Sequence, residues 1–145
     1  MTTVDGLSHI TIVVTNLERT ADFFTHILGA QEVCSSGERA FSLSREKFFL
    51  IGGIWFAIME GEELSERSYN HIAFKVSEPS LGEFRERPID IGIDFREDRP
   101  RVGGEGKSIY FYDYDNHLFE LHSGTLQERL LVYHKNRIAT VEAVT

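Results

Sequence analysis

The sequence predicts an α+β protein made of two copies of one βαβββ unit. Two similar segments, Gly6–Val14 and Ser68–Val76, each have a histidine at the fourth position, His9 and His71. Each histidine opens an alternating run of β-branched or aromatic residues, which is typical of a strand. A similar order of elements follows each segment, so the chain has the signature of an internal repeat. Two such units folded face to face can hold a metal ion between them.

In the first half, the strand His9–Val14 leads into a helix near Leu17–Leu28. Asn16 is a suitable N-cap for this helix, and Gly29 is a suitable C-terminal stop. An apolar stripe at helical spacing supports the helix and consists of Leu17, Ala21, Phe24 and Leu28. Short strands are then expected at Gln31–Ser35, Ala40–Leu43, Phe48–Ile51 and Ile54–Glu60.

The second half repeats this order. The strand His71–Val76 precedes a weaker helix near Ser80–Arg87, which Pro88 ends or kinks. Further strands are expected at Asp94–Arg96, Ser108–Tyr112 and Leu118–Ser123. A last helix starts at Thr125, where Thr125-Leu126-Gln127-Glu128 matches a capping box, and we expect the chain to be frayed after Lys135. These elements predict one domain over residues 1–135, with repeats at about 6–62 and 68–124, and a tail at 136–145.

The composition of the 145-residue chain excludes several classes of protein. A formal net charge of −8 argues against non-specific binding to nucleic acid or to an anionic membrane surface. No apolar run approaches the roughly 20 residues that cross a bilayer, and the N-terminus lacks the features of a signal peptide. Cys34 has no second cysteine to pair with, and we expect it to be structural rather than a nucleophile. A cytoplasmic protein is therefore expected.

Three side chains are candidate metal ligands. His9 and His71 occupy matching strand positions, and Glu120 lies in the strand-like run Leu118–His122. A carboxylate in an apolar strand is costly to bury unless it is paired or bound to a metal. Two neutral imidazoles and one carboxylate suit a divalent transition metal and leave coordination positions open. Either histidine alone is explained better as a strand-end residue with satisfied hydrogen bonds, and it is the repeated pair together with Glu120 that favours a metal site.

Two features beside these ligands are less specific. His122 shares a strand face with Glu120 and could support it, although we do not expect it to be a ligand. The glycine-rich segment Gly103–Ser108 is not a P-loop, because Arg101 stands where that motif needs glycine and a strand follows it. With Arg99, Arg101 and Lys107 it could wrap a small anion. An ordinary hairpin loop with solvated charges explains the segment as well.

Several motifs together resemble the vicinal oxygen chelate superfamily. They are Ser8-His9-Ile10-Thr11, Tyr69-Asn70-His71, Tyr110-Phe111-Tyr112-Asp113 and Asn116 to His122 with Gly124. Within that superfamily the chain is similar to the fosfomycin-resistance proteins. The segment Ser42–Ile51 resembles the epoxide-hydrating branch, the FosX type. The resemblance runs from about Gly6 to about Tyr133. It implies paired βαβββ repeats in a domain-swapped dimer that opens the epoxide of fosfomycin with water at C1 to give an inactive diol.

The resemblance also implies a role for individual residues. His9, His71 and Glu120 match the metal ligands, usually of Mn²⁺, with His9 of one chain meeting His71 and Glu120 of the other. Glu46 matches the general base, although the charged triplet Arg45-Glu46-Lys47 alone would suggest a solvated surface charge. Positions that line the pocket or hold the substrate are matched by Thr11, Trp55, Tyr69, Ser108, Tyr110 and Arg129.

The anion loop departs from the thiol-transferring relatives, which use a lysine and a second serine there. This chain has Pro100 and Gly104 at the nearby positions, and Arg99 or Arg101 could substitute. A thiol transferase using glutathione, bacillithiol or cysteine is one alternative to the hydrating enzyme. A non-catalytic protein that sequesters a drug is another, although such proteins usually lack the two-histidine, one-glutamate set.

Overall fold

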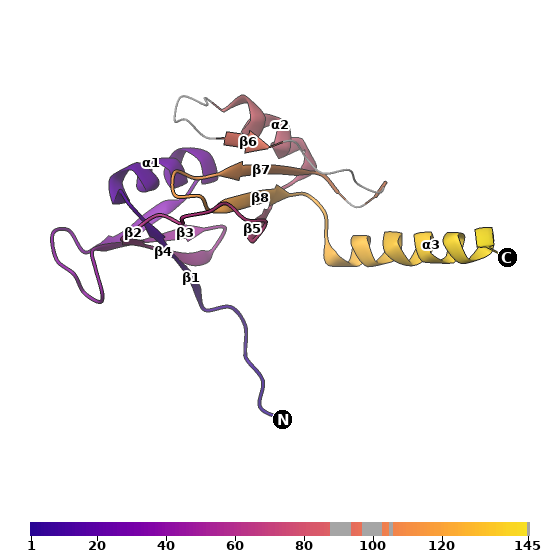
Figure 1. Ribbon diagram of the computed structural model, residues 1–145, viewed down its shortest axis with the longest axis horizontal. Helices are drawn as coiled ribbons and strands as arrows, with labels where there is room; N and C mark the ends of the chain where they lie inside the picture. The colour runs from indigo at the N-terminus through magenta and orange to yellow at the C-terminus, as the bar shows by residue number, and fades with distance from the viewer. Residues whose placement is uncertain (88–93, 97–102, 105, 145) are drawn as a thin grey trace. The chain divides into compact units, whose positions relative to one another are not determined.

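The computed structural model describes residues 1–87, 94–96, 103–104 and 106–144, with side chains omitted for 94–96 and 138–144. These residues form two compact units. The first unit comprises residues 1–67 and 113–117, and the second comprises the remaining described residues. The predicted order of elements is confirmed, because each unit contains one βαβββ series (Figure 1). No helix in the described part of the chain is long and apolar enough to cross a membrane.

The first unit is a four-stranded sheet with a helix on one face. Its strands are β1 (His9–Val14), β2 (Gln31–Ser35), β3 (Glu46–Ile51) and β4 (Ile54–Glu60), in the spatial order β1-β4-β3-β2. Helix α1 (Leu17–Leu28) begins at Asn16, whose side chain accepts a hydrogen bond from the Arg19 amide, and ends at Gly29 in the left-handed conformation. Both predicted caps are therefore confirmed.

The second unit repeats this sheet. Its strands are β5 (His71–Lys75), β6 (Asp94–Arg96), β7 (Ser108–Tyr112) and β8 (Leu118–His122), in the spatial order β5-β8-β7-β6. Helix α2 (Glu78–Glu86) follows β5 and contributes the buried Leu81 to the core. Helix α3 (Leu126–Val144) follows β8 and begins directly after Thr125, whose hydroxyl accepts from the Glu128 amide at 3.1 Å.

The two sheets have equivalent strand pairing as well as the same strand order. In each unit the first and last strands pair in parallel, which brings Thr11 beside Ala57 and Ala73 beside Glu120. Thr11 and Ala73 each lie two residues after the strand-opening histidine. Ala57 is therefore the counterpart of Glu120 in the first unit, and it carries no ligand atom.

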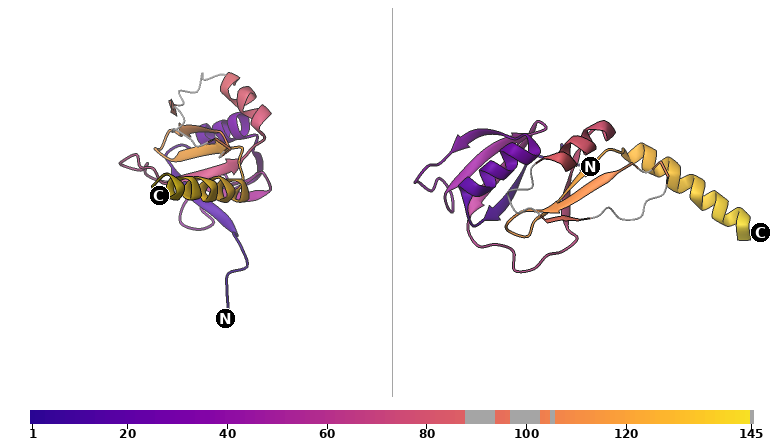
Figure 2. Two further views of the ribbon diagram at one scale, coloured as in Figure 1. Left: turned by 90° about the vertical axis from the view of Figure 1, so that its right-hand side faces the viewer. Right: turned by 90° about the horizontal axis from the view of Figure 1, so that it is seen from above.

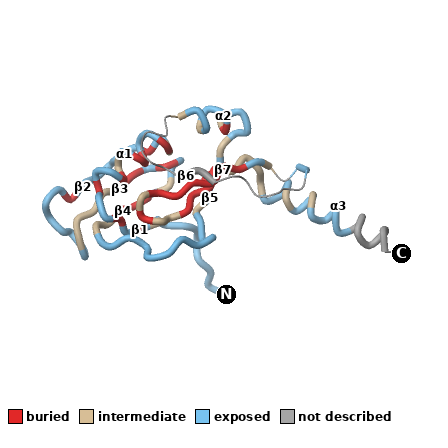
Figure 3. The backbone as a smooth tube through the Cα atoms, turned by 45° about the horizontal axis from the view of Figure 1, so that its top comes forward, coloured by how far each residue is buried: buried red, intermediate tan, exposed pale blue. Residues whose placement is uncertain are grey.

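The first sheet buries one face and leaves candidate site residues on the other. In the first unit the buried side chains of β1, β3 and β4 include Ile12, Phe49 and Phe56. Figure 3 colours the backbone by burial, with buried residues in red. Phe24 of α1 packs edge-on against Phe49 and Phe56, with ring centroids 5.3 Å and 5.1 Å apart. Because strand side chains alternate between faces, the opposite face of this sheet carries His9, Thr11, Glu46 and Trp55.

Two sequence predictions about regular structure are wrong. Residues 40–43 form bends and not a strand, and Phe41 and Leu43 are exposed. They lie in the connection between β2 and β3, whose pairing ends at Ser35 and Lys47, so no neighbouring strand faces them. The chain after Lys135 is helical and not frayed, because α3 continues to Val144 (Figure 2). No glycine or proline interrupts that stretch.

Element ends differ from prediction by a few residues. Strand β3 begins at Glu46 rather than Phe48, because Ser36 bonds the backbone of Glu46 through both its amide and its hydroxyl. Helix α2 spans Glu78–Glu86 rather than Ser80–Arg87. Strands β5 and β8 each end one residue early, at Lys75 and His122.

The aromatic core of the first unit predicts a large difference between two chemically identical substitutions. Phe24→Ala removes a fully buried ring and should lower the free energy of unfolding by about 3–5 kcal/mol. Phe41→Ala removes a ring that is 65% exposed and should change it by less than about 0.5 kcal/mol. Urea denaturation at one protein concentration measures both. Equal losses would contradict the assigned core.

Candidate active site

His71 and Glu120 approach each other on the open face of the second sheet. His71 Nε2 lies 2.9 Å from Glu120 Oε2. The other ring nitrogen of His71, Nδ1, lies 2.7 Å from the Tyr69 carbonyl oxygen. A carbonyl oxygen only accepts, so Nδ1 carries a hydrogen and Nε2 is the ring nitrogen that faces Glu120. This is the arrangement of a histidine that ligates a metal.

Glu120 is almost completely buried, at 5% exposure, and is charged. Burial raises the pKa of this carboxyl and is the largest single influence on it. Hydrogen bonds from Ser108 and Tyr110, together with the charges of His122 and His71, outweigh burial and lower the pKa below its ordinary value. Glu120 is therefore an ionised carboxylate at neutral pH, which is the form that binds a cation.

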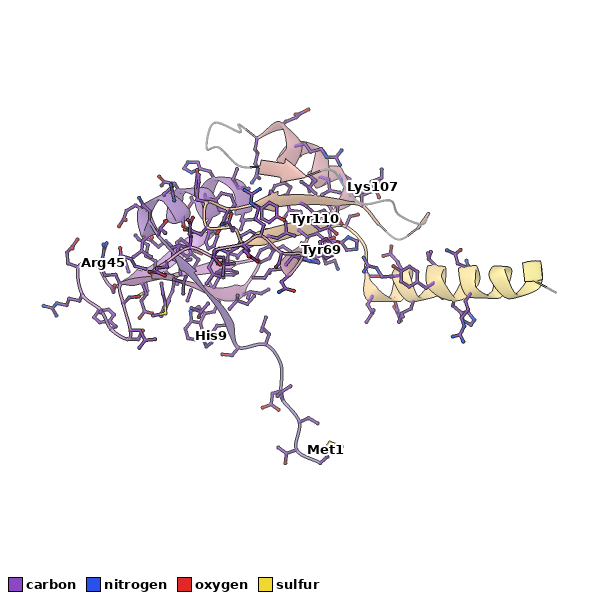
Figure 4. The ribbon with its side chains drawn as sticks, viewed as in Figure 1. Met1, His9, Arg45, Tyr69, Lys107 and Tyr110 are labelled. Carbon is purple, nitrogen blue, oxygen red and sulfur yellow. The ribbon has the colours of Figure 1, made fainter. Side chains whose placement is uncertain are left out.

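Two tyrosines surround the His71 ring. Tyr69 and Tyr110, both labelled in Figure 4, have their hydroxyl oxygens 3.1 Å apart. Both rings lie edge-on to His71, with centroids 4.9 Å and 5.7 Å away. Tyr110 is buried, whereas Tyr69 is 55% exposed. Together they form an aromatic wall with two hydroxyl groups beside the ligand pair.

A cavity of about 280 Å³ opens beside this pair. Its lining includes His71, Glu120, His122 and Arg129, the last of which comes from the first turns of α3. A guanidinium in the wall of the cavity suits an anionic ligand, because its planar fork matches phosphonate or carboxylate oxygens.

His9 is held in the first unit in a similar way to His71. The Ser8 hydroxyl lies 2.9 Å from His9 Nδ1, and the Trp55 ring stacks on the imidazole with centroids 4.2 Å apart. Nδ1 is thus engaged locally, and Nε2 is the nitrogen available for a ligand. Thr11 lies two residues farther along β1 on the same face and is exposed.

Glu46 stands at the start of β3 on that same open face of the first sheet. Its neighbours are paired elsewhere: Arg45 bonds Glu18 and Glu60, and Lys47 bonds Glu32. Among the described residues, the Glu46 carboxylate has a long contact of 3.5 Å from the Ser42 hydroxyl and no ion pair. Within the charged triplet, Arg45 and Lys47 thus form ion pairs with glutamates other than Glu46.

The structure brings some of the predicted site residues together and divides others between the units. His71, Glu120, Tyr69, Ser108, Tyr110 and Arg129 belong to the second unit, and His9, Thr11, Glu46 and Trp55 to the first. Arg99 and Arg101 lie outside the described residues. Within the described part of the chain, no three side chains of histidine, cysteine, aspartate or glutamate gather as a metal site. The two-histidine, one-glutamate set stays a prediction.

The residues present nevertheless fit a divalent metal. Each predicted histidine has Nδ1 held by a neighbour within two residues, and the predicted carboxylate is ionised despite burial. The sequence did not single out Ser8 as the partner of His9 or Ser108 as the partner of Glu120. The adjacency of Ser8 was visible in the sequence, whereas the Ser108 contact depends on pairing between β7 and β8.

A family model identifies the class of protein. The Glyoxalase/Bleomycin resistance protein/Dioxygenase superfamily matches residues 6–121, and the chain belongs to this superfamily. The fosfomycin resistance protein FosX of Listeria monocytogenes is 55% identical over 132 residues, which span 91% of this chain and 99% of that protein. A metallothiol transferase, FosB of Shouchella clausii, is 37% identical and covers 91% of this chain and 89% of its own.

A solved structure of one of these relatives supports the same family. A variant of Listeria monocytogenes FosX, complexed with Mn(II) and 1S,2S-dihydroxypropylphosphonic acid, superimposes with a TM-score of 0.83. It is 52% identical and covers 91% of this chain and 100% of its own. The predicted fold family is therefore confirmed.

The stacking of His9 on Trp55 gives a direct test of His9 as a ligand. Trp55 is the single tryptophan of the chain, so a paramagnetic Co²⁺ ion bound at His9 should quench nearly all of the tryptophan fluorescence. His9→Gln should abolish quenching at low Co²⁺ concentration. His26→Gln, at an exposed histidine of α1, is the matched control and should quench as the parent does. Quenching unchanged in His9→Gln would remove His9 from the site.

Proposed function

We propose that this protein is a Mn²⁺-dependent hydrolase that opens the epoxide of fosfomycin with water and thereby confers resistance to the antibiotic. The observation that carries the proposal is the pair His71 and Glu120, an imidazole nitrogen 2.9 Å from a buried, ionised carboxylate. The high identity to FosX over almost the whole chain supports the same conclusion. The Mn(II) and the dihydroxypropylphosphonic acid in the related FosX structure support the metal and the diol product.

His9, His71 and Glu120 would hold the metal, which supplies a Lewis acid for the oxygen that becomes negatively charged as the ring opens. Glu46 accepts a proton from water as the water oxygen attacks C1. The new C1–O bond replaces the epoxide C1–O bond, and a proton returns to the released oxygen to give the diol. We assign the rest of the phosphonate to the side chains of Thr11, Trp55, Tyr69, Ser108, Tyr110 and Arg129. Arg99 and Arg101, which precede the glycine-rich segment in the sequence, are further candidates.

The proposal includes a homodimer that shares each metal site between subunits. One chain contributes His9 and the other contributes His71 and Glu120. The division of these ligands between two separate units is compatible with sharing. We also propose that the protein acts in the cytoplasm.

A thiol transferase is the second candidate, because FosB is also a relative. It would use the same metal and substrate but would add a thiol in place of water. Glu46 favours hydration, since among the described residues its carboxylate forms no ion pair, and it lies on the face of the first sheet that carries His9. A drug-sequestering protein would not need the ionised Glu120.

Phosphorus NMR of the product separates these functions. Incubating the purified protein with Mn²⁺ and fosfomycin, without any thiol, should convert the fosfomycin signal into that of the diol. A reaction that requires glutathione, bacillithiol or cysteine and yields the adduct mass would identify a transferase. Fosfomycin recovered unaltered after denaturation of the protein would identify a binding protein.

Replacing Glu46 isolates the proton-transfer step. Glu46→Gln keeps the size of the side chain but cannot accept the proton, so the hydration rate should fall by about 10²–10⁴-fold. Mn²⁺ and fosfomycin affinities, measured by calorimetry, should change little. Glu62→Gln, at an exposed glutamate in the connection after β4, is the control and should leave the rate unaltered. Full turnover by Glu46→Gln would exclude Glu46 as the base.

A further inference from the structure

A chain of three polar side chains lies behind the face that Glu120 presents to His71. Ser108 is 1% exposed, and its hydroxyl is hydrogen-bonded to Glu120 Oε1 and lies 2.7 Å from His122 Nδ1. Strand pairing produces this arrangement, since Ser108 of β7 lies directly opposite His122 of β8. Glu120 is two residues from His122 on the same face of β8.

The direction of the hydrogen bonds in this chain is fixed by Glu120. An ionised carboxylate only accepts, so Ser108 must use its single hydroxyl hydrogen on Glu120 Oε1. The Ser108 oxygen then accepts from His122, which must carry its hydrogen on Nδ1. His122 donates to Ser108, and Ser108 donates to Glu120.

The backbone beside His122 restricts the ring. Gly106 has a φ of +91°, and a Cβ there would lie 2.7 Å from the backbone of Gly124 and 3.2 Å from His122 Cε1. The chain before β7 therefore packs against both the imidazole edge and the residue that ends the turn after β8. A side chain at position 106 has no room, because the backbone there lies close to Gly124 and to the edge of the His122 ring.

We propose that His122 is a positioning residue for Glu120, acting through Ser108. It orients the Ser108 hydroxyl so that Oε1 is tied back and Oε2 is directed at His71 Nε2, 2.9 Å away. Without the His122 donor, the Ser108 oxygen loses one of the two hydrogen bonds that set its orientation, and the carboxylate is held less firmly. This inference rests on the proposed metal-dependent function. In it His122 orients a metal ligand and does not itself bind the metal.

The test compares Mn²⁺ affinity in variants that keep or remove the donor. His122→Phe retains a ring without the Nδ1 donor and should weaken Mn²⁺ binding by about 10–100-fold, the usual effect of losing a partner of a ligand. His122→Asn places an amide N–H near the position of Nδ1 and should stay within about threefold of the parent. His26→Phe on α1 is the control for the same exchange at an exposed histidine. Free Mn²⁺ is measured by electron paramagnetic resonance without substrate.

A double-mutant cycle gives a second readout should His122→Phe fold poorly. Ser108→Ala removes the middle of the chain, and combining it with His122→Ala, which removes the donor, should weaken Mn²⁺ binding no more than Ser108→Ala alone. Additive losses, equal losses in His122→Phe and His122→Asn, or parent-like affinity in His122→Phe would each overturn the proposal. Parent protein that binds Mn²⁺ but does not hydrate fosfomycin would contradict the proposed function and leave this comparison valid.

Discussion

A charged carboxylate buried in an apolar strand is the constraint on which the second unit depends. Glu120 is flanked in β8 by the buried Phe119 and Leu121, which face the opposite side of the sheet. Burying a lone charge at such a position is strongly unfavourable unless hydrogen bonds and opposite charges compensate. Ser108, Tyr110 and His71 supply that compensation from two neighbouring strands. The strand register therefore packs the core and also places beside Glu120 the groups that compensate its charge.

The two repeats differ at the position of this charge, so the charge occurs in one unit only. Both units place a histidine at the start of the first strand and a partner residue on the parallel last strand, but the partner is Glu120 in one and Ala57 in the other. Each unit therefore presents a different set of functional groups. The second presents a carboxylate, an imidazole and tyrosine hydroxyls, and the first presents an imidazole, an indole and the Glu46 carboxylate. Neither open face alone contains all the groups that the proposed reaction needs.

The sequence was sufficient for the order of elements, the helix caps and the matched positions of His9 and His71, because each depends on local periodicity or on one capping residue. It failed at residues 40–43, where an alternating pattern has no strand beside it to pair with. It also failed after Lys135, where fraying was expected although no glycine or proline interrupts the helix. The hydrogen-bonded chain from His122 through Ser108 to Glu120 was beyond prediction, because it requires the pairing of β7 with β8. Only the shared face of Glu120 and His122 was visible in advance.

The central claim is that His9 and the pair His71 and Glu120 complete one metal site, with the two parts coming from different chains. Mixing two inactive variants, His9→Ala and Glu120→Gln, under conditions that allow subunit exchange tests it most directly. A shared site predicts recovery of roughly a quarter of the parent hydration rate, because half of the dimers are mixed and each has one intact site. A mixture no more active than the separate variants would contradict the account.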